Sequence, residues 1–114
     1  MKIHKLTSFL LTAFLALQLT AQSGKIVGTI TDGDYNEPMA FANVLVKNTT
    51  TGTTSDFDGK YQLEISEGNY SIIFSYIGYQ SVEISDVNVV ANSEVLVDVT
   101  LNTNSLEAVI ITTT

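Results

Sequence analysis

The sequence contains no cysteine, no tryptophan, one proline and one histidine, His4. Without cysteine no disulfide can hold the fold together, so its stability has to come from a packed core. His4 lies in an N-terminal segment that we expect to be removed, which leaves no imidazole base for a Ser nucleophile. The acidic residues alternate with apolar ones or occupy turns, which is typical of solvated faces rather than of a converging carboxylate pair. We therefore expect no enzyme activity and no cofactor.

Cationic residues are also scarce. Five lysines and no arginine stand against twelve acidic residues, and the formal charge is −7. All twelve acidic residues lie beyond residue 21, together with only three lysines, so that part of the chain carries a charge of −9. This excess of negative charge disfavours nucleic acid and anionic lipid surfaces as partners.

The longest apolar run is at the N-terminus. Lys2, His4 and Lys5 precede the run over Leu6–Leu19, and Ala21 supplies a small residue after it. This order is typical of a secretory signal peptide. A membrane anchor or a buried helix is the alternative, but the run is shorter than the about 20 apolar residues that span a bilayer. The sequence therefore predicts an exported protein whose signal-peptide helix, residues 1–21, is cleaved after Ala21.

The remaining chain is organised around Gly52–Ser66, which reads GTTSDFDGKYQLEIS. Apolar and polar residues alternate from Tyr61 to Ser66, and a period of two predicts a strand with one buried face. The side chains of Asp56 and Asp58 can accept bonds from nearby N–H groups, and Gly59 tolerates positive φ, so we expect a hairpin turn here. Asp-x-Asp-Gly also begins a calcium-binding loop, but the lysine that follows has the wrong charge beside a dication. A turn is the favoured interpretation.

The same alternation recurs about every ten residues, with turn-forming residues between the runs. Seven strands at this spacing predict an all-β fold, a seven-stranded antiparallel β-sandwich. We expect the strands at residues 25–31, 42–47, 53–55, 60–66, 70–77, 81–87 and 94–101. Inward-facing apolar residues form the predicted core: Ile26, Ile30, Val44, Val46, Tyr61, Leu63, Ile65, Ile72, Phe74, Tyr76, Val82, Ile84, Val95, Val97, Val99 and Leu101.

Two aromatic residues, Tyr76 and Tyr79, lie at a predicted bend that contains Gly78. Such a pair can form a surface patch that binds glycans, or its rings can fill the core and leave the hydroxyl groups in water. Both interpretations stay open, and Tyr76 and Tyr79 are the candidate patch.

The last residues differ from the strands before them. Asn102–Ser105 is polar, and Leu106–Thr114 is β-prone with no turn that would return it to the sandwich. Three consecutive branched apolar side chains, Val109, Ile110 and Ile111, would form an aggregation-prone tail in water. We expect this segment to add as a strand to a partner's sheet, or to lead into further sequence. A plain connector or another strand of the sandwich is the alternative.

Several motifs occur in an order and spacing that resemble one family. They are Gly28-Thr29-Ile30-Thr31-Asp32, Glu37-Pro38 followed by Ala42-Asn43-Val44, Gly52-Thr53-Thr54-Ser55-Asp56-Phe57-Asp58-Gly59-Lys60-Tyr61, and Phe74-Ser75-Tyr76-Ile77-Gly78-Tyr79. With the valine-rich strand and LEAVIIT after them, they resemble the carboxypeptidase-regulatory-like (transthyretin-like) domain at the N-terminus of TonB-dependent outer-membrane receptors from Bacteroidetes-type bacteria. The resemblance extends from about Lys25 to Thr112.

The resemblance implies a transthyretin/Ig-like sandwich over residues 22–102 and a linker over residues 103–114 that contains a TonB-box-like segment. That segment is Glu107, Ala108, Val109, Ile110, Ile111 and Thr112, with Ala108 in place of a second acidic residue of the commonest form. The implied partners are a TonB-type energy-coupling protein and the plug and barrel of the same receptor. The zinc ligands of carboxypeptidases are missing from the sequence.

The implied function is that of a non-catalytic accessory domain on the periplasmic side of the outer membrane. The receptor would take up siderophores, vitamins or oligosaccharides, and this chain would be a fragment without plug and barrel. Two other functions stay open: a free-standing secreted sandwich that binds polysaccharide or mediates adhesion, and a periplasmic carrier of small ligands.

Overall fold

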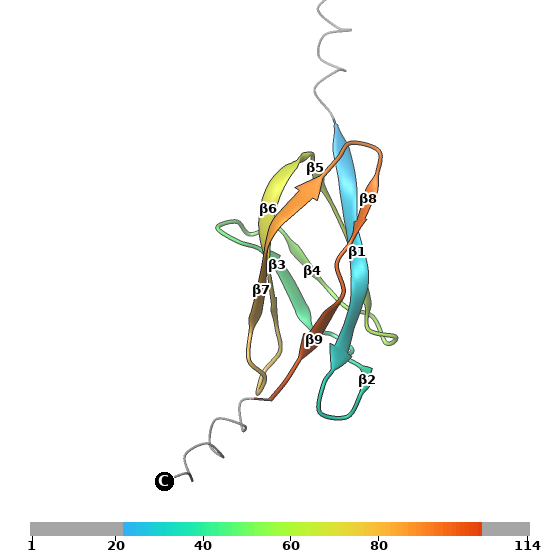
Figure 1. The fold of residues 1–114 in the computed structure, drawn as a ribbon, viewed down its shortest axis with the longest axis vertical. Helices are drawn as coiled ribbons and strands as arrows, with labels where there is room; N and C mark the ends of the chain where they lie inside the picture. The colour runs from blue at the N-terminus through green and yellow to red at the C-terminus, as the bar shows by residue number, and fades with distance from the viewer. Residues whose placement is uncertain (1–21, 104–114) are drawn as a thin grey trace, which may run out of the picture.

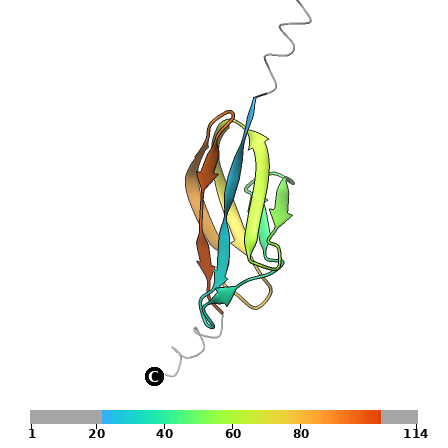
Figure 2. The ribbon, with the colours of Figure 1, turned by 90° about the vertical axis from the view of Figure 1, so that its right-hand side faces the viewer.

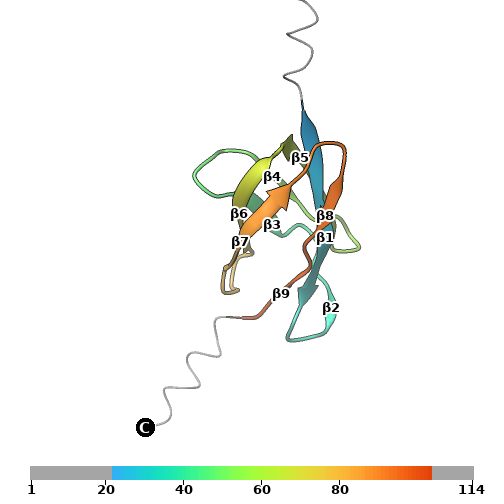
Figure 3. The ribbon, with the colours of Figure 1, turned by 45° about the horizontal axis from the view of Figure 1, so that its top comes forward.

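The computed structural model describes residues 22–103. One sheet of the protein is built on the strand β1, Ser23–Asp32. Along one edge β1 pairs antiparallel with β5 (Lys60–Ser66) and, near its end, with the short β2 (Glu37–Pro38). Along the other edge it pairs in parallel with β8 (Glu94–Leu96) and β9 (Val99–Leu101), as Figure 1 and Figure 3 show. The predicted signal peptide lies outside the described residues.

The second sheet is antiparallel and faces the first (Figure 2). Its strand order is β4 (Gly52–Thr54), β3 (Asn43–Val46), β6 (Gly68–Ser75) and β7 (Val82–Val89). The predicted all-β sandwich is therefore confirmed. No helix in the described part of the chain has the length and hydrophobicity that crossing a membrane would require.

The predicted strand 94–101 differs from expectation in two ways, because it forms two strands and pairs with β1 in parallel rather than antiparallel. After β7 the chain crosses from the second sheet to the first and arrives where β1 begins. The Asn92 N–H donates to the Ser23 carbonyl at 2.8 Å, and the Lys25 N–H donates to the Ser93 carbonyl at 2.9 Å. From there β8 and β9 can only run alongside β1 in the same direction.

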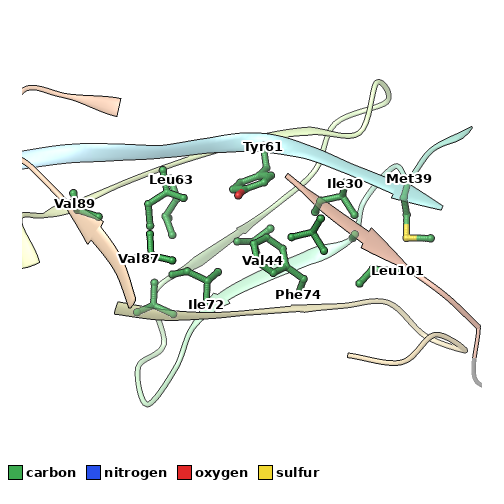
Figure 4. Packing of buried hydrophobic residues seen from close by; sticks show 14 residues of the cluster. Ile30, Met39, Val44, Tyr61, Leu63, Ile72, Phe74, Val87, Val89 and Leu101 are labelled. Carbon is green, nitrogen blue, oxygen red and sulfur yellow. The ribbon is translucent and has the colours of Figure 1, made fainter. Parts of the chain in front are cut away.

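The core between the sheets consists of apolar side chains from both of them (Figure 4). The Tyr61 ring points from β5 towards Phe74 on β6, with ring centroids 5.5 Å apart in an edge-to-face arrangement. The buried residues are Ile26, Ile30, Met39, Ala42, Val44, Val46, Tyr61, Leu63, Ile72, Phe74, Val87, Val89, Val99 and Leu101. The other predicted core residues are half-buried and pack against this cluster: Ile65, Tyr76, Val82, Ile84, Val95 and Val97.

A β-bulge explains why Val87 and Val89 are buried although the predicted alternation placed even-numbered residues of β7 inward. Tyr70 pairs with Val87, but Ile72 pairs with Ile84, so β7 has one residue more than β6 between these pairs. Asp86 takes up the extra residue with a φ of 58°. Because the side-chain period in a strand is two, the added residue moves the inward face from even to odd positions.

β1 approaches the segment between β8 and β9 closely at Gly28. A Cβ on Gly28 would lie 1.9 Å from the Val97 carbonyl oxygen, a distance that no side chain can have. That carbonyl accepts a hydrogen bond of 2.6 Å from the Tyr61 hydroxyl, and the Thr29 N–H donates to Asp98 Oδ1 at 2.8 Å. Burial raises the pKa of the Tyr61 hydroxyl, and the negative charge of Asp98 raises it further. These bonds replace the ordinary ladder at the break between β8 and β9.

Gly28→Ala is therefore expected to destabilise the fold by about 1–3 kcal/mol or more, because β1 and Val97 have to separate. Tyr61→Phe removes the donor from the Val97 carbonyl and should cost about 1–3 kcal/mol. Urea denaturation measures both changes. Thr29→Ala, one residue further along β1 and on its other face, is the control and should stay within about 0.5 kcal/mol of the unchanged protein. An effect of Gly28→Ala no larger than that of the control would contradict the close-packing role.

Candidate functional site

The end of the sandwich from which the C-terminal segment leaves is the candidate site. The β1–β2 turn, the β6–β7 turn and the end of β9 meet there (Figure 1 and Figure 3). We call Asp32, Asp34, Tyr79, Asn102 and Thr103 the exit cluster. The Gln80 N–H donates to the Asn102 carbonyl at 2.8 Å, and Thr103 forms an antiparallel bridge with Tyr79. The Thr103 hydroxyl donates to Asp34 Oδ2 at 2.8 Å.

Tyr79 joins the two turns through its hydroxyl, which donates to Asp32 Oδ2 at 2.6 Å. The other carboxylate oxygen of Asp32 accepts from the N–H of Asp34 at 2.9 Å and from that of Tyr35 at 3.4 Å, which shapes the β1–β2 turn. On the other side, the Tyr79 N–H donates to the Tyr76 carbonyl at 3.0 Å, and Gly78 has a φ of 88°. The bend predicted around Gly78 is therefore a tight turn.

The hydrogen bond between Tyr79 and Asp32 shifts the pKa values of both groups in opposite directions. The hydroxyl hydrogen bond lowers the pKa of Asp32, and the N–H groups of Asp34 and Tyr35 act in the same sense, while desolvation opposes them. The same hydrogen bond raises the pKa of Tyr79 to about 12, and desolvation and the nearby carboxylates add to the shift. Across neutral pH the pair therefore consists of a neutral phenol and a carboxylate.

The rings of the predicted patch, Tyr76 and Tyr79, pack edge-to-face with centroids 5.7 Å apart. Both are half-buried and lie against the core, and the residue between them that reaches furthest into solvent is Ile77, with 89% of its surface exposed. The structure thus brings the two tyrosines together and engages the Tyr79 hydroxyl internally. Ligand binding by this pair stays a prediction.

The predicted TonB-box-like segment, Glu107, Ala108, Val109, Ile110, Ile111 and Thr112, lies outside the described residues. What the structure adds is the attachment of the residues just before it. The sequence did not predict the bonds of Asp32 and Asp34 to Tyr79 and Thr103. The partners are 47 and 69 residues apart, and no local pattern links them.

The Asp56-x-Asp58-Gly59 motif forms the predicted turn. Asp56 Oδ1 accepts hydrogen bonds from the N–H groups of Asp58 and Lys60, each at 2.9 Å, and Gly59 has a φ of 75°. Among residues 22–103, no group of three or more His, Cys, Asp or Glu side chains is arranged to hold a metal ion.

Comparisons with known proteins agree on the family. Residues 26–111 match the CarboxypepD_reg-like domain. The chain is 31% identical over 103 residues to TonB-dependent receptor P3 of Formosa agariphila, a match that covers 90% of this chain and 10% of that protein. It is 45% identical over 71 residues to TonB-dependent receptor SusC of Bacteroides thetaiotaomicron, which covers 62% of this chain and 7% of that protein. The chain thus spans about a tenth or less of the length of these relatives.

The fold is similar to that of a chain in a cohesin–X-dockerin complex from Acetivibrio cellulolyticus, with a TM-score of 0.58 at 19% identity. This match covers 68% of the present chain and 56% of the other, and at such low identity it shows the fold alone. The family match extends over most of the chain, takes in both sheets of the sandwich and agrees with the resemblance seen in the sequence motifs. The chain belongs to the CarboxypepD_reg-like domain family and is a relative of TonB-dependent receptors.

Proposed function

We propose that this protein is the N-terminal accessory domain of a TonB-dependent outer-membrane receptor for nutrient uptake, on the periplasmic side of the membrane. Residues 1–21 are its signal peptide, residues 22–102 are the sandwich, and residues 103–114 carry the coupling segment. The relatives are named TonB-dependent receptors, and this chain corresponds to a small part of their length. The nutrient belongs to the siderophores, vitamins or oligosaccharides.

The exit cluster is the observation that carries this proposal. Its hydrogen bonds attach Asn102 and Thr103 to two turns of the sandwich, so these last described residues are held at a defined point on the domain. The β-prone residues that follow can then reach the sheet edge of a TonB-type protein. Strand addition of this kind takes its affinity from backbone hydrogen bonds and tolerates sequence changes such as Ala108 in the segment. The domain's role is to hold and space the coupling segment.

The gene provides the first test. We expect the reading frame to continue past Thr114 into a plug and a barrel, since the relatives are about ten times longer than the match. Sequencing the coding region downstream of Thr114 decides the matter. A stop codon directly after Thr114 would contradict the receptor assignment and favour a free-standing sandwich.

The second test concerns the coupling segment. Since the described domain has no cysteine of its own, a single cysteine can report on its surroundings. Val109→Cys in the full receptor is expected to form disulfides with cysteines placed on the sheet edge of the TonB-type protein, because strand addition brings paired residues to about 5.5 Å. Asn69→Cys, on the exposed start of β6, is the control and should not cross-link. Equal cross-linking at both positions would argue against a specific contact.

The third test addresses the exit cluster. Tyr79→Phe removes the hydroxyl that joins the two turns, so amide hydrogen exchange at Leu101, Asn102 and Thr103 should become faster while the amide of Ile72 in the core keeps its rate. Tyr35→Phe removes an exposed hydroxyl from the same end and should leave exchange unchanged. If the exchange rate at Thr103 does not change in Tyr79→Phe, the exit cluster does not hold the end of the domain in place.

The fourth test uses pH. The pKa of Tyr79 is raised above its ordinary value of 10.0 to about 12, so its contribution to stability is complete below pH 10 and is lost as pH rises towards 12. The pKa of Asp32 is lowered from 3.8, so its contribution is present above that pH and is lost below it. In denaturation experiments Tyr79→Phe should remove the alkaline pH dependence of the free energy of unfolding and weaken the acidic one, because the N–H groups of Asp34 and Tyr35 still lower the pKa of Asp32. In a phenolate absorbance titration, the difference between the unchanged protein and Tyr79→Phe should show one group titrating near 12.

A further inference from the structure

The edges of the two sheets differ in how they are protected against pairing. β7 contains the bulge, β4 has three residues and β2 has two, while β8 and β9 are separated at Val97 and Asp98. Proteins blunt sheet edges in such ways because unpaired backbone groups template pairing with another chain. Among the described strands, β5 is an edge without these features. It has seven residues without glycine or proline, and its register with β1 is unbroken.

The backbone groups of β5 point alternately to β1 and to the open edge. The Ile30 N–H donates to the Gly59 carbonyl at 2.7 Å, so odd-numbered residues of β5 face β1 and even-numbered ones face away. At Lys60 both outward backbone groups are already bonded to Asp56. The Asp56 N–H donates to the Lys60 carbonyl at 2.8 Å, and the Lys60 N–H donates to Asp56 Oδ1 at 2.9 Å.

Further along β5, the outward N–H and carbonyl groups of Gln62 and Glu64 have no partner in the described part of the chain. At Ser66 the carbonyl accepts from the Tyr70 hydroxyl at 2.7 Å. The open part of the edge is therefore short and well defined. On Gln62 and Glu64, whose side chains are exposed, it offers two donors and two acceptors in alternation, and the Ser66 N–H also faces outward at its end.

We infer that β5 is a self-association edge, to which a second copy of this chain adds its own β5 in the antiparallel direction across a twofold axis at Leu63. In this register Gln62 of each copy faces Glu64 of the other, and four backbone hydrogen bonds form. Every free outward group of these two residues then has a partner. The inference stands independently of the proposed receptor function.

The neighbouring registers are less favourable. An axis at Glu64 would place two carboxylates directly opposite each other, which is destabilising. An axis at Gln62 would place Glu64 opposite Lys60 of the second copy, whose outward backbone groups are taken by Asp56. The axis at Leu63 avoids both problems and places Lys60 opposite Ser66, so that no like charges face each other.

Side chains favour a second copy of this chain as the occupant. One oxygen of the Glu64 carboxylate accepts from Ser23 Oγ at 3.0 Å, and the other is left for the Gln62 amide of the second copy. On the inner face, the half-buried Ile65 would come to lie opposite Tyr61 of the second copy and lose its remaining exposure to water. The other sheet ends on this side in the three-residue β4, which presents little backbone to an approaching molecule.

The negative charge of each copy opposes association, so the dimer is weak, with a dissociation constant on the order of 0.1–1 mM at physiological salt. The test uses the chain without its signal peptide, in sedimentation and NMR measurements from about 10 µM to about 2 mM. We expect a concentration-dependent dimer and concentration-dependent shifts at the amides of Gln62 and Glu64. A monomer over the whole range would overturn the inference.

Substitutions at Gln62 test the interface. Gln62→Glu places like charges opposite each other in both Gln62–Glu64 pairs and should weaken the dimer about tenfold. Gln62→Lys places opposite charges there and should strengthen the dimer about fivefold. Asn43→Glu and Asn43→Lys, exposed on β3 of the other sheet, make the same changes in net charge and are the controls. If the Asn43 variants change association as much as the Gln62 variants do, general repulsion accounts for the effect and the inference is wrong.

Disulfide formation tests the register. A mixture of Gln62→Cys and Glu64→Cys chains should cross-link between the two variants, because paired residues lie about 5.5 Å apart. Gln62→Cys alone should cross-link poorly, since its two copies are diagonal to each other. Efficient cross-linking of Gln62→Cys with itself would place the axis at Gln62 and overturn the proposed register.

Discussion

The hydrogen bond from the Tyr61 hydroxyl to the Val97 carbonyl links β5 directly to the segment between β8 and β9, although the two lie on opposite sides of β1 and share no backbone pairing. β1 has β5 on one side and the β8–β9 segment on the other, and the glycine at position 28 allows that segment to come within contact of β1. The Tyr61 ring crosses over this glycine and packs on Phe74 of the facing sheet. This one side chain of β5 thus contacts β1, the segment between β8 and β9, and the opposite layer, in a chain that has no disulfide.

This arrangement also determines at which end of the sandwich the residues after β9 lie. Because β8 and β9 follow β1 in parallel, the C-terminal segment emerges at the same end as the β1–β2 turn. The turns after β1 and after β6 hold its first residues through Asp34 and Gln80, and the bond between Tyr79 and Asp32 joins the turns to each other. The proposed coupling function depends on this geometry rather than on any reactive group, which agrees with a family of regulatory-like domains.

Much of the fold could be predicted, because the alternation of apolar and polar residues is a local property that each strand carries by itself. The segment 60–66 is predicted and observed at the same residues, and Asp56 shapes the turn before it as expected. The prediction failed where one strand departs from its own period. Nothing in the residues around Ser85 and Asp86 indicates a bulge, and so Val87 and Val89 were missed from the core.

By itself the sequence determined most of the strands, the turn at Asp56–Gly59, the family and the negative charge, since each of these follows from the order of neighbouring residues, whereas β2 and the break between β8 and β9 were not predicted. The tertiary structure alone decided which strands pair in parallel, how the buried Ser55 hydroxyl joins the Met39 carbonyl to the Ala42 N–H, and which residues hold the departing chain. Those features depend on hydrogen bonds between residues from 13 to 69 positions apart. Such pairs produce no periodic pattern in the sequence, because each hydrogen bond involves one donor and one acceptor that only the folded chain brings together.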